Sequence, residues 1–182
     1  MPLLVSGIAS HRWTHATMRV AAKETSNPVL RADMKTSSGQ EAQHYKNHAR
    51  VNDIVRGQLS DRATAAMRDL EDRLDADYRR FSNEKSVAFN LAYGEGFEAM
   101  TFSLARSDMD AGTPQRVVPE WANLIAWHLC EEIEHRTVTF DAYDQIVGKY
   151  LYRLADGHHP RHPAGDVARY NPRNVALFDN VR

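Results

Sequence analysis

The sequence predicts an all-α protein whose helices pack as a bundle. Apolar residues recur at helical spacing in several long segments, and one such stripe comprises Met67, Leu70, Leu74 and Tyr78. No segment of consequence shows the two-residue alternation of a β-strand. Pro, Gly, Ser and Asn cluster between the periodic segments, where helix ends are expected. Together these observations favour a bundle of helices around one core.

The first two predicted helices are separated by a short break. The first covers about residues 11–23, and Ser26-Asn27-Pro28 ends it. Pro28 suits the first turn of the next helix, because its nitrogen would have no partner within that helix anyway. The second helix covers about residues 29–55, with a weak point at Ser37-Ser38-Gly39.

Three more helices are expected after residue 60. The third covers about residues 60–81 and carries the apolar stripe. Either Ser82 or Asn83 is expected to cap the fourth, over about residues 84–106, because short polar side chains accept hydrogen bonds from a helix's first turn. A polar loop follows over residues 108–118, and Pro119 then opens a long fifth helix to about residue 154.

The chain is expected to divide into a metal-binding bundle, residues 1–152, and an extended tail, residues 153–182. The tail is rich in Gly, Pro and His, a composition typical of chain without regular structure. Its His158, His159 and His162 are expected to lie in a solvated loop rather than at a metal site.

The composition makes several classes of function improbable. The chain has 182 residues and a formal net charge of -1, which favours neither nucleic acid nor an anionic membrane as a partner. No stretch is long and apolar enough for a transmembrane helix, and the N-terminus lacks a signal-peptide pattern. The single Cys130 allows no internal disulfide and is expected to be a buried or interface thiol. We therefore expect a cytoplasmic protein.

Two Glu-x-x-His words are the strongest functional signal. Glu41 precedes His44, and Glu132 precedes His135, each pair within a predicted helix. Residues three apart share a helix face. A buried Glu/His face is costly unless its carboxylates are paired or bound to a cation. The words therefore predict a metal site between helices, and the alternative is a buried Glu–His hydrogen-bond network.

Other candidate residues lie close to these words in the sequence. Glu95 and Glu98 share a face of the fourth helix that is lined by small residues. Glu131 lies at the edge of the second word's face, and Tyr45 lies beside the first. The first helix has no carboxylate before Glu24, but it contains a pair of histidines one turn apart, His11 and His15.

These words resemble those of a known family, the predicted metal-dependent hydrolases of the ferritin-like type. Members carry words similar to QEAxHxxxHxxxN, LAxxxxxEHxTA and WHxxEEIEHKxVAFDVY, which match here at residues 40–52, 91–101 and 127–143. The resemblance covers roughly residues 10–152 and implies a ferritin-like bundle. It implies metal ligands at Glu41, His44, Glu98, Glu132 and His135, and a role for His48 and His128 as ligands or as residues that orient ligands.

The chain departs from the family words at three positions. The Glu of a Gly-Glu-Arg near the start corresponds to His11, so an imidazole replaces a carboxylate ligand or the ligand is lost. Ala99 stands where a His usually follows the middle Glu, and Arg136 stands where a Lys follows the last His. A site with more imidazole carries less negative charge, which weakens the case for a standard di-iron cluster.

Three functions are compatible with these residues. Mixed Glu and His ligands suit iron, manganese or zinc, and two iron ions are the expected cofactor. The first hypothesis is an O2-dependent oxidase or oxygenase acting on a small organic substrate. The second is a hydrolase that uses metal-activated water, with Glu131 or Glu95 as general base. The third is a metal-binding bundle without catalysis.

Two further expectations accompany these hypotheses. Tyr45 is a candidate proton donor or redox-active tyrosine, although an ordinary core tyrosine is the simpler interpretation. The apolar helix faces of so short a chain make a homodimer plausible.

Overall fold

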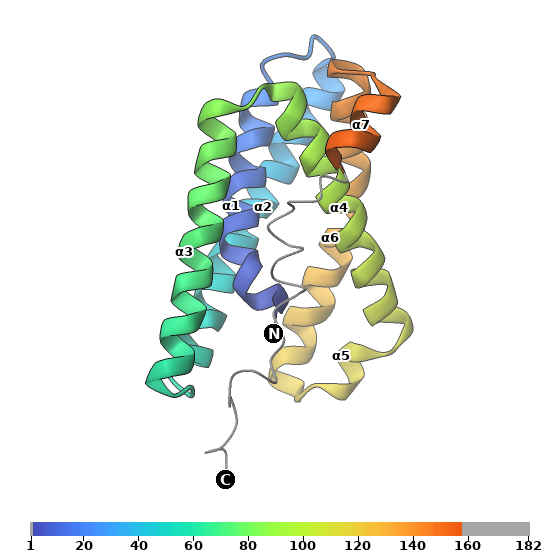
Figure 1. Ribbon diagram of the computed structural model, residues 1–182. Coiled ribbons are helices and arrows are strands. Elements are labelled where there is room, and N and C mark those ends of the chain that lie inside the picture. The colour runs from blue at the N-terminus through green and yellow to red at the C-terminus, as the bar shows by residue number, and fades with distance from the viewer. Residues whose placement is uncertain (1, 158–182) are drawn as a thin grey trace. The chain divides into compact units, whose positions relative to one another are not determined.

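The computed structural model describes residues 2–157, and their regular structure is entirely α-helical (Figure 1). This confirms the predicted all-α bundle. Residues 158–182, which include most of the predicted tail and its three histidines, lie outside the described residues. The helices are α1 (Pro2–Ala21), α2 (Pro28–Arg56), α3 (Asp61–Glu84), α4 (Val87–Asp110), α5 (Thr113–Arg116), α6 (Pro119–Ile146) and α7 (Tyr150–Gly157).

The described chain divides into two compact units, and the division falls inside α1 and α2. Unit 1 contains residues 2–16 and 41–85, and unit 2 contains residues 17–40 and 86–157. The first Glu-x-x-His word therefore lies in unit 1, and the second lies in unit 2. The predicted boundary between residues 152 and 153 lies within α7, so helix continues past it to Gly157.

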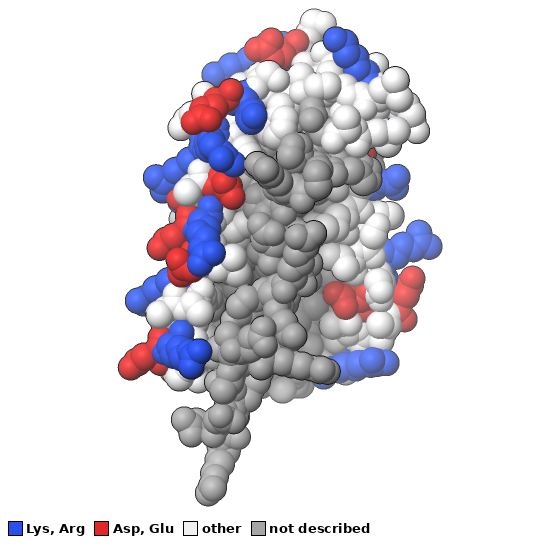
Figure 2. Space-filling view, viewed as in Figure 1, with Lys and Arg blue, Asp and Glu red and all other residues white. Residues whose placement is uncertain are grey.

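Unit 1 is built around the apolar face of α3. Met67, Leu74 and Tyr78 of the predicted stripe are buried. The α1 residue Trp13 stacks on Tyr78, with ring centroids 5.2 Å apart. The exposed side of α3 carries acidic and basic side chains in alternation, as Figure 2 shows, and Arg80 pairs there with Asp77 at 2.9 Å. The helix is therefore amphipathic, as its sequence predicts.

Unit 2 has a core to which α1, α2, α4 and α6 contribute. In Figure 1, α4 runs beside α6 within this unit. Leu91 and Tyr143 are almost completely buried. Burial of these apolar side chains holds α4 against α6 and so places the polar residues of both helices near one another. The core cluster comprises Met18, Ala21, Ala22, Leu30, Met34, Leu91, Ala92, Ala142 and Tyr143.

The predicted cap of the fourth helix is wrong. Neither Ser82 nor Asn83 begins α4, because both lie in the last turn of α3. Ser86 is the cap, and its Oγ accepts a hydrogen bond from the backbone nitrogen of Phe89 at 3.1 Å. The segment contains two serines four residues apart, so composition alone does not distinguish the correct cap.

The N-cap assignment predicts different effects for these two serines. Ser86→Ala is expected to lower the free energy of unfolding by about 1 kcal/mol, because a first-turn N–H of α4 loses its acceptor. Ser82→Ala, an equally exposed change in α3, is expected to have little effect. Urea denaturation monitored by circular dichroism would compare them, and equal losses would contradict the assignment.

Two other helix boundaries differ from the prediction. The predicted long fifth helix is interrupted, because α6 ends at Ile146 and Gly148 adopts a left-handed conformation with φ of 61°. Glycine tolerates this conformation and commonly follows a helix end. The first helix begins at Pro2 rather than near residue 11, and the short α5 lies within the predicted loop. Cys130 is exposed, so it is not the buried thiol that was one of its two predicted environments; an interface thiol stays a prediction.

Candidate metal centre

Unit 1 contains three imidazoles, two of them buried and that of His48 partly exposed, beside one carboxylate. We call these residues the imidazole group: His11, Glu41, His44 and His48. His11 is 5% exposed, and neither Glu41 nor His44 has exposed surface. The Nδ1 atom of His11 lies 2.7 Å from the Oε2 atom of Glu41. An ionised carboxylate only accepts hydrogen bonds, so Nδ1–H of His11 is the donor.

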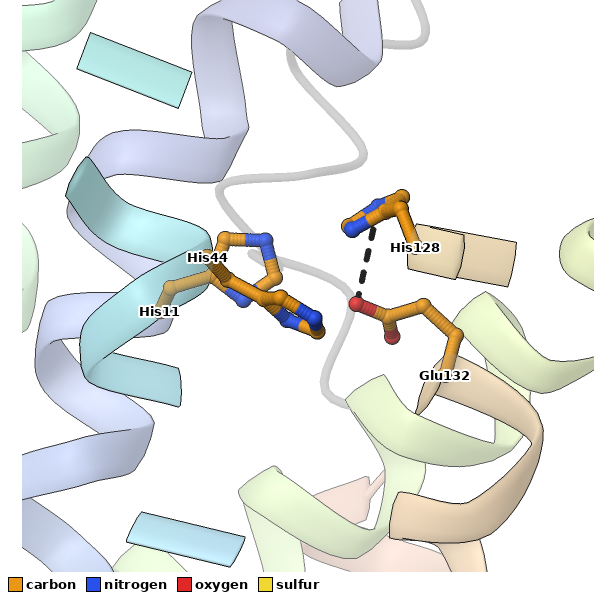
Figure 3. A group of neighbouring side chains, drawn as sticks. All are labelled: His11, His44, His128 and Glu132. Carbon is orange, nitrogen blue, oxygen red and sulfur yellow. Dashed lines mark ion pairs between the residues drawn. The ribbon is translucent and has the colours of Figure 1, made fainter. Parts of the chain in front are cut away.

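The other two imidazoles of this group lie against His11. Its ring centroid is 4.8 Å from that of His44 and 4.9 Å from that of His48. A ring nitrogen of His11 and one of His44 lie within 4.8 Å of each other. Figure 3 shows these two side chains at the facing positions of α1 and α2. Residues predicted from α1 and from the first word are thus brought together.

A network of charged residues continues the same face of α2. Asn52 is buried and donates from Nδ2 to the Oε1 atom of Glu71 on α3, at 2.7 Å. The Nη1 atom of Arg56 lies 2.7 Å from Glu71 Oε2. Burial lowers the pKa of Arg56, but its hydrogen bond to Asp53 and the two nearby negative charges outweigh burial and raise the pKa above the usual value. The sequence contains no motif that would have pointed to Glu71.

Unit 2 contains a second group, which we call the carboxylate group: Glu98, Glu132 and His135. Each offers one ligand atom, and these three atoms lie within 4.8 Å of one another. All three side chains are buried. Glu132 and His135 are one turn apart on α6, and Glu98 comes from the adjacent α4. Unit 2 therefore assembles three of the predicted ligands.

Two other candidates, His128 and Glu131, lie on α6 within four residues of Glu132. The Nε2 atom of His128 is 3.7 Å from the Oε1 atom of Glu132, as the dashed line in Figure 3 shows. His128 is partly exposed. Glu131 is also partly exposed and accepts a hydrogen bond from Gln40 Nε2 at 3.2 Å. Gln40 is the first residue of the QEA word, but its partner lies 91 positions later and is not readable from that word.

The structure gives Glu95 a partner that the sequence did not indicate. Its Oε1 atom lies 3.8 Å from Nη1 of Arg153 on α7, and the guanidinium of Arg153 also lies over the ring of Phe140. Because its carboxylate is engaged by Arg153, Glu95 is a weaker candidate for a general base. Tyr45 is partly buried on α2, and its chemical role stays a prediction.

The donor atoms of both groups suit a divalent transition metal. Two carboxylates held this close and buried repel each other unless a proton or a cation lies with them. One imidazole and two carboxylates suit iron, manganese and zinc, whereas magnesium and calcium prefer oxygen alone. The residues present in unit 2 therefore fit a bound metal ion, as predicted from the words.

Comparison with known proteins agrees with this assignment. A family model described as a predicted metal-dependent hydrolase matches residues 9–157, which is more than half of the chain. The chain belongs to this family. The predicted metal-dependent hydrolase family thus covers both groups of candidate ligands, in agreement with the resemblance of the sequence words. No significant match was found among curated proteins or among solved structures.

The hydrophobicity of the helices bears on the expectation that the chain has no transmembrane helix. Across residues 2–157, no helix of this predicted metal-dependent hydrolase is both long and apolar enough to cross a bilayer. Small-molecule substrate, O2, homodimer and cytoplasmic location stay predictions from the sequence.

Proposed function

We propose that the protein is a metal-dependent hydrolase whose carboxylate group binds the catalytic metal ion. The observation that carries the proposal is the buried set of Glu98, Glu132 and His135, whose ligand atoms lie within 4.8 Å of one another, in a chain that belongs to a family described as hydrolases. Catalytic metal sites commonly have three protein ligands and one position open to water or substrate.

The role of general base is assigned to Glu131, which precedes the candidate ligand Glu132 in the chain. A metal ion in this position would lower the pKa of bound water and polarise the group to be cleaved. Glu131 accepts the proton of the attacking water, because it is partly exposed and Gln40 holds one of its oxygens. As the water oxygen bonds to the electrophilic atom of the substrate, the bond from that atom to the leaving group breaks, and Glu131 returns the proton to the leaving group.

The hydrolase is favoured over the oxidase hypothesis by the family description. The oxidase remains a second candidate, because a carboxylate-rich donor set with one imidazole also suits ferrous iron. The two differ in what they consume: a hydrolase needs only water, whereas an oxidase consumes O2. Two iron ions belong to the oxidase hypothesis, and zinc or manganese would serve hydrolysis equally well.

The experiment that tests the proposal combines metal analysis with two activity assays. Protein purified without a His tag would be analysed for metal by mass spectrometry. It would then be assayed against activated carboxylic and phosphoric esters, before and after chelation and metal re-addition, with an oxygen electrode in parallel. Metal-dependent ester cleavage without O2 uptake is expected. Substrate-dependent O2 uptake would favour the oxidase, and protein without metal would overturn both.

The assignment of Glu131 predicts a loss of rate without a loss of metal. Glu131→Gln keeps the shape of the side chain but removes its basicity, so kcat is expected to decrease by about 10²- to 10⁴-fold. Metal content should stay at the wild-type level. Glu95→Gln is the matched control, because Glu95 is paired with Arg153, and it should retain most of the activity. A larger decrease in kcat in Glu95→Gln than in Glu131→Gln would show that Glu95 is the general base instead.

A further inference from the structure

We propose that Arg153 on α7 binds an oxyanion of the substrate, either the anion of a carboxylic acid or a phosphate. The inference deepens the proposed function and rests on it for the place of the bond that is cleaved. It adds a class of substrate, an ester that carries a negative charge, which the family description does not name. Arg153 also lies beyond the last of the sequence words, which ends at Tyr143.

Two aromatic rings hold the guanidinium of Arg153 in place. Its central carbon lies 5.0 Å from the ring centroid of Phe140 on α6 and 5.4 Å from that of Tyr150 on α7. A cation in this position is attracted by the negative face of the ring. This attraction uses the charge of the guanidinium and needs no hydrogen-bond acceptor, so its five N–H donors stay available. The rings therefore fix the group without using its capacity to bind oxygen atoms.

The N–H donors of this guanidinium lack an acceptor within residues 2–157. The carboxylate oxygen Oε1 of Glu95 lies 3.8 Å from Nη1 of Arg153, which is too far for a hydrogen bond. The side chain of Arg153 is only 21% exposed, so most of it is shielded from solvent. A shielded charged donor without an acceptor is costly. A guanidinium held in this way suits an oxyanion, which it contacts through two parallel N–H bonds.

The contact with Glu95 places Arg153 close to the carboxylate group of unit 2. Glu95 and Glu98 are one turn apart on α4 and share a face, with Cβ atoms about 5–6 Å apart. On α6, Phe140 follows His135 in the direction of α7. Both helices therefore lead from the candidate ligands toward Arg153, and Figure 1 shows α7 packed beside α4. A substrate whose charge and ester bond are a few carbon atoms apart would reach both.

Arg136 is a matched arginine of the same unit that lacks these features. Its guanidinium also lies over an aromatic ring, 4.7 Å from the centroid of Phe102. Arg136 is exposed, however, so solvent can accept from its donors. Contact with a ring alone therefore does not identify a binding site. The combination of shielding, unmet donors and nearness to Glu98 is what distinguishes Arg153.

The charge of the substrate tests the proposal in an activity assay. Nitrophenyl half-esters of dicarboxylic acids, which carry one free carboxylate, would be compared with neutral nitrophenyl esters of the same chain length. The metal-loaded wild-type enzyme is expected to have the higher kcat/KM on the half-esters. Arg153→Met keeps the apolar stem of the side chain but removes its charge. It should lower kcat/KM on half-esters by about 10- to 100-fold, and hardly change it on neutral esters.

Two further variants separate substrate binding from a purely structural role. Arg153→Lys keeps the charge without the planar fork, so it should restore part of the kcat/KM on half-esters. Arg136→Met should leave kcat/KM on both kinds of ester at the wild-type level. Equal losses on half-esters and neutral esters in Arg153→Met would show that Arg153 only holds α7 in place, and would overturn the proposal.

Anion binding measured without catalysis distinguishes this inference from the proposed function. Inorganic phosphate and acetate would each be titrated into Zn²⁺-loaded protein, and nuclear magnetic resonance would follow the Nε signal of Arg153, assigned through Arg153→Lys. A saturable shift at Arg153, and none at Arg136, is expected. No shift with either anion would overturn this inference, even in a protein that cleaves neutral esters and so retains the proposed function. A shift in protein that cleaves no ester would leave the anion site standing and overturn the hydrolase.

Discussion

Glu132→Ala is expected to lose the metal ion of unit 2 and the hydrolytic activity together. Glu132 is 4% exposed and is one of three buried ligand candidates whose donor atoms lie within 4.8 Å. Removing it leaves Glu98 and His135, too few protein ligands to retain a cation tightly. Loss of a residue that only orients a ligand typically lowers activity by about 10- to 100-fold. The decrease in activity in Glu132→Ala should be larger than this.

The same helix offers a matched control for this variant. Glu134 lies two residues along α6 and is exposed, so Glu134→Ala removes a carboxylate of the same kind from the opposite side. Metal content by mass spectrometry and kcat/KM on the best ester would be measured for both, after circular dichroism has shown that both are folded. Full metal occupancy in folded Glu132→Ala protein would refute the assignment of the carboxylate group.

Leu91→Ala is expected to destabilise the protein more than any surface change proposed above. Leu91 has no exposed surface and packs in the core of unit 2 with Met34 and Tyr143. Replacing leucine by alanine loses buried apolar surface and leaves a cavity, so the free energy of unfolding should decrease by about 2–5 kcal/mol. Leu91 and Glu98 lie on the same helix, so this packing also supports the position of a candidate ligand.

Leu104→Ala provides the control on the same helix. Leu104 is 41% exposed, and its replacement is expected to change the free energy of unfolding by no more than about 0.5 kcal/mol. Guanidinium denaturation of metal-free protein would compare the two variants, so that metal binding does not contribute to the difference. A Leu91→Ala protein as stable as the control would show that the core described here is not tightly packed in solution.

The features that the sequence predicts well are local ones. Helix type follows from apolar periodicity, and the pairing of Glu132 with His135 follows from a spacing of one turn. The contacts it does not predict join residues far apart in the chain. Glu131 with Gln40 and Glu95 with Arg153 depend on how helices pack, which a single sequence does not specify.

The role of His11 is predicted partly by the sequence and partly only by the packing of helices. The family words identify it as a substituted ligand position, and this follows from sequence alone. Its hydrogen bond to Glu41 is seen only when α1 and α2 are placed together. The choice between Ser86 and Ser82 as helix cap is a smaller example, because it depends on where α3 ends.

Gly148 lies in the turn between two helices, because α6 ends at Ile146 and α7 begins at Tyr150. Its φ is 61°, and a Cβ there would lie 3.0 Å from the carbonyl oxygen of Asp144, so any side chain at this position would be strained. Tyr143 fixes the same turn, because its hydroxyl donates to the carbonyl oxygen of Lys149 at 2.7 Å. Insertions or deletions beyond Gly148 therefore do not rotate Glu132 and His135 about the axis of α6. Related chains can vary in length after this glycine while the candidate ligands stay on the same face of α6.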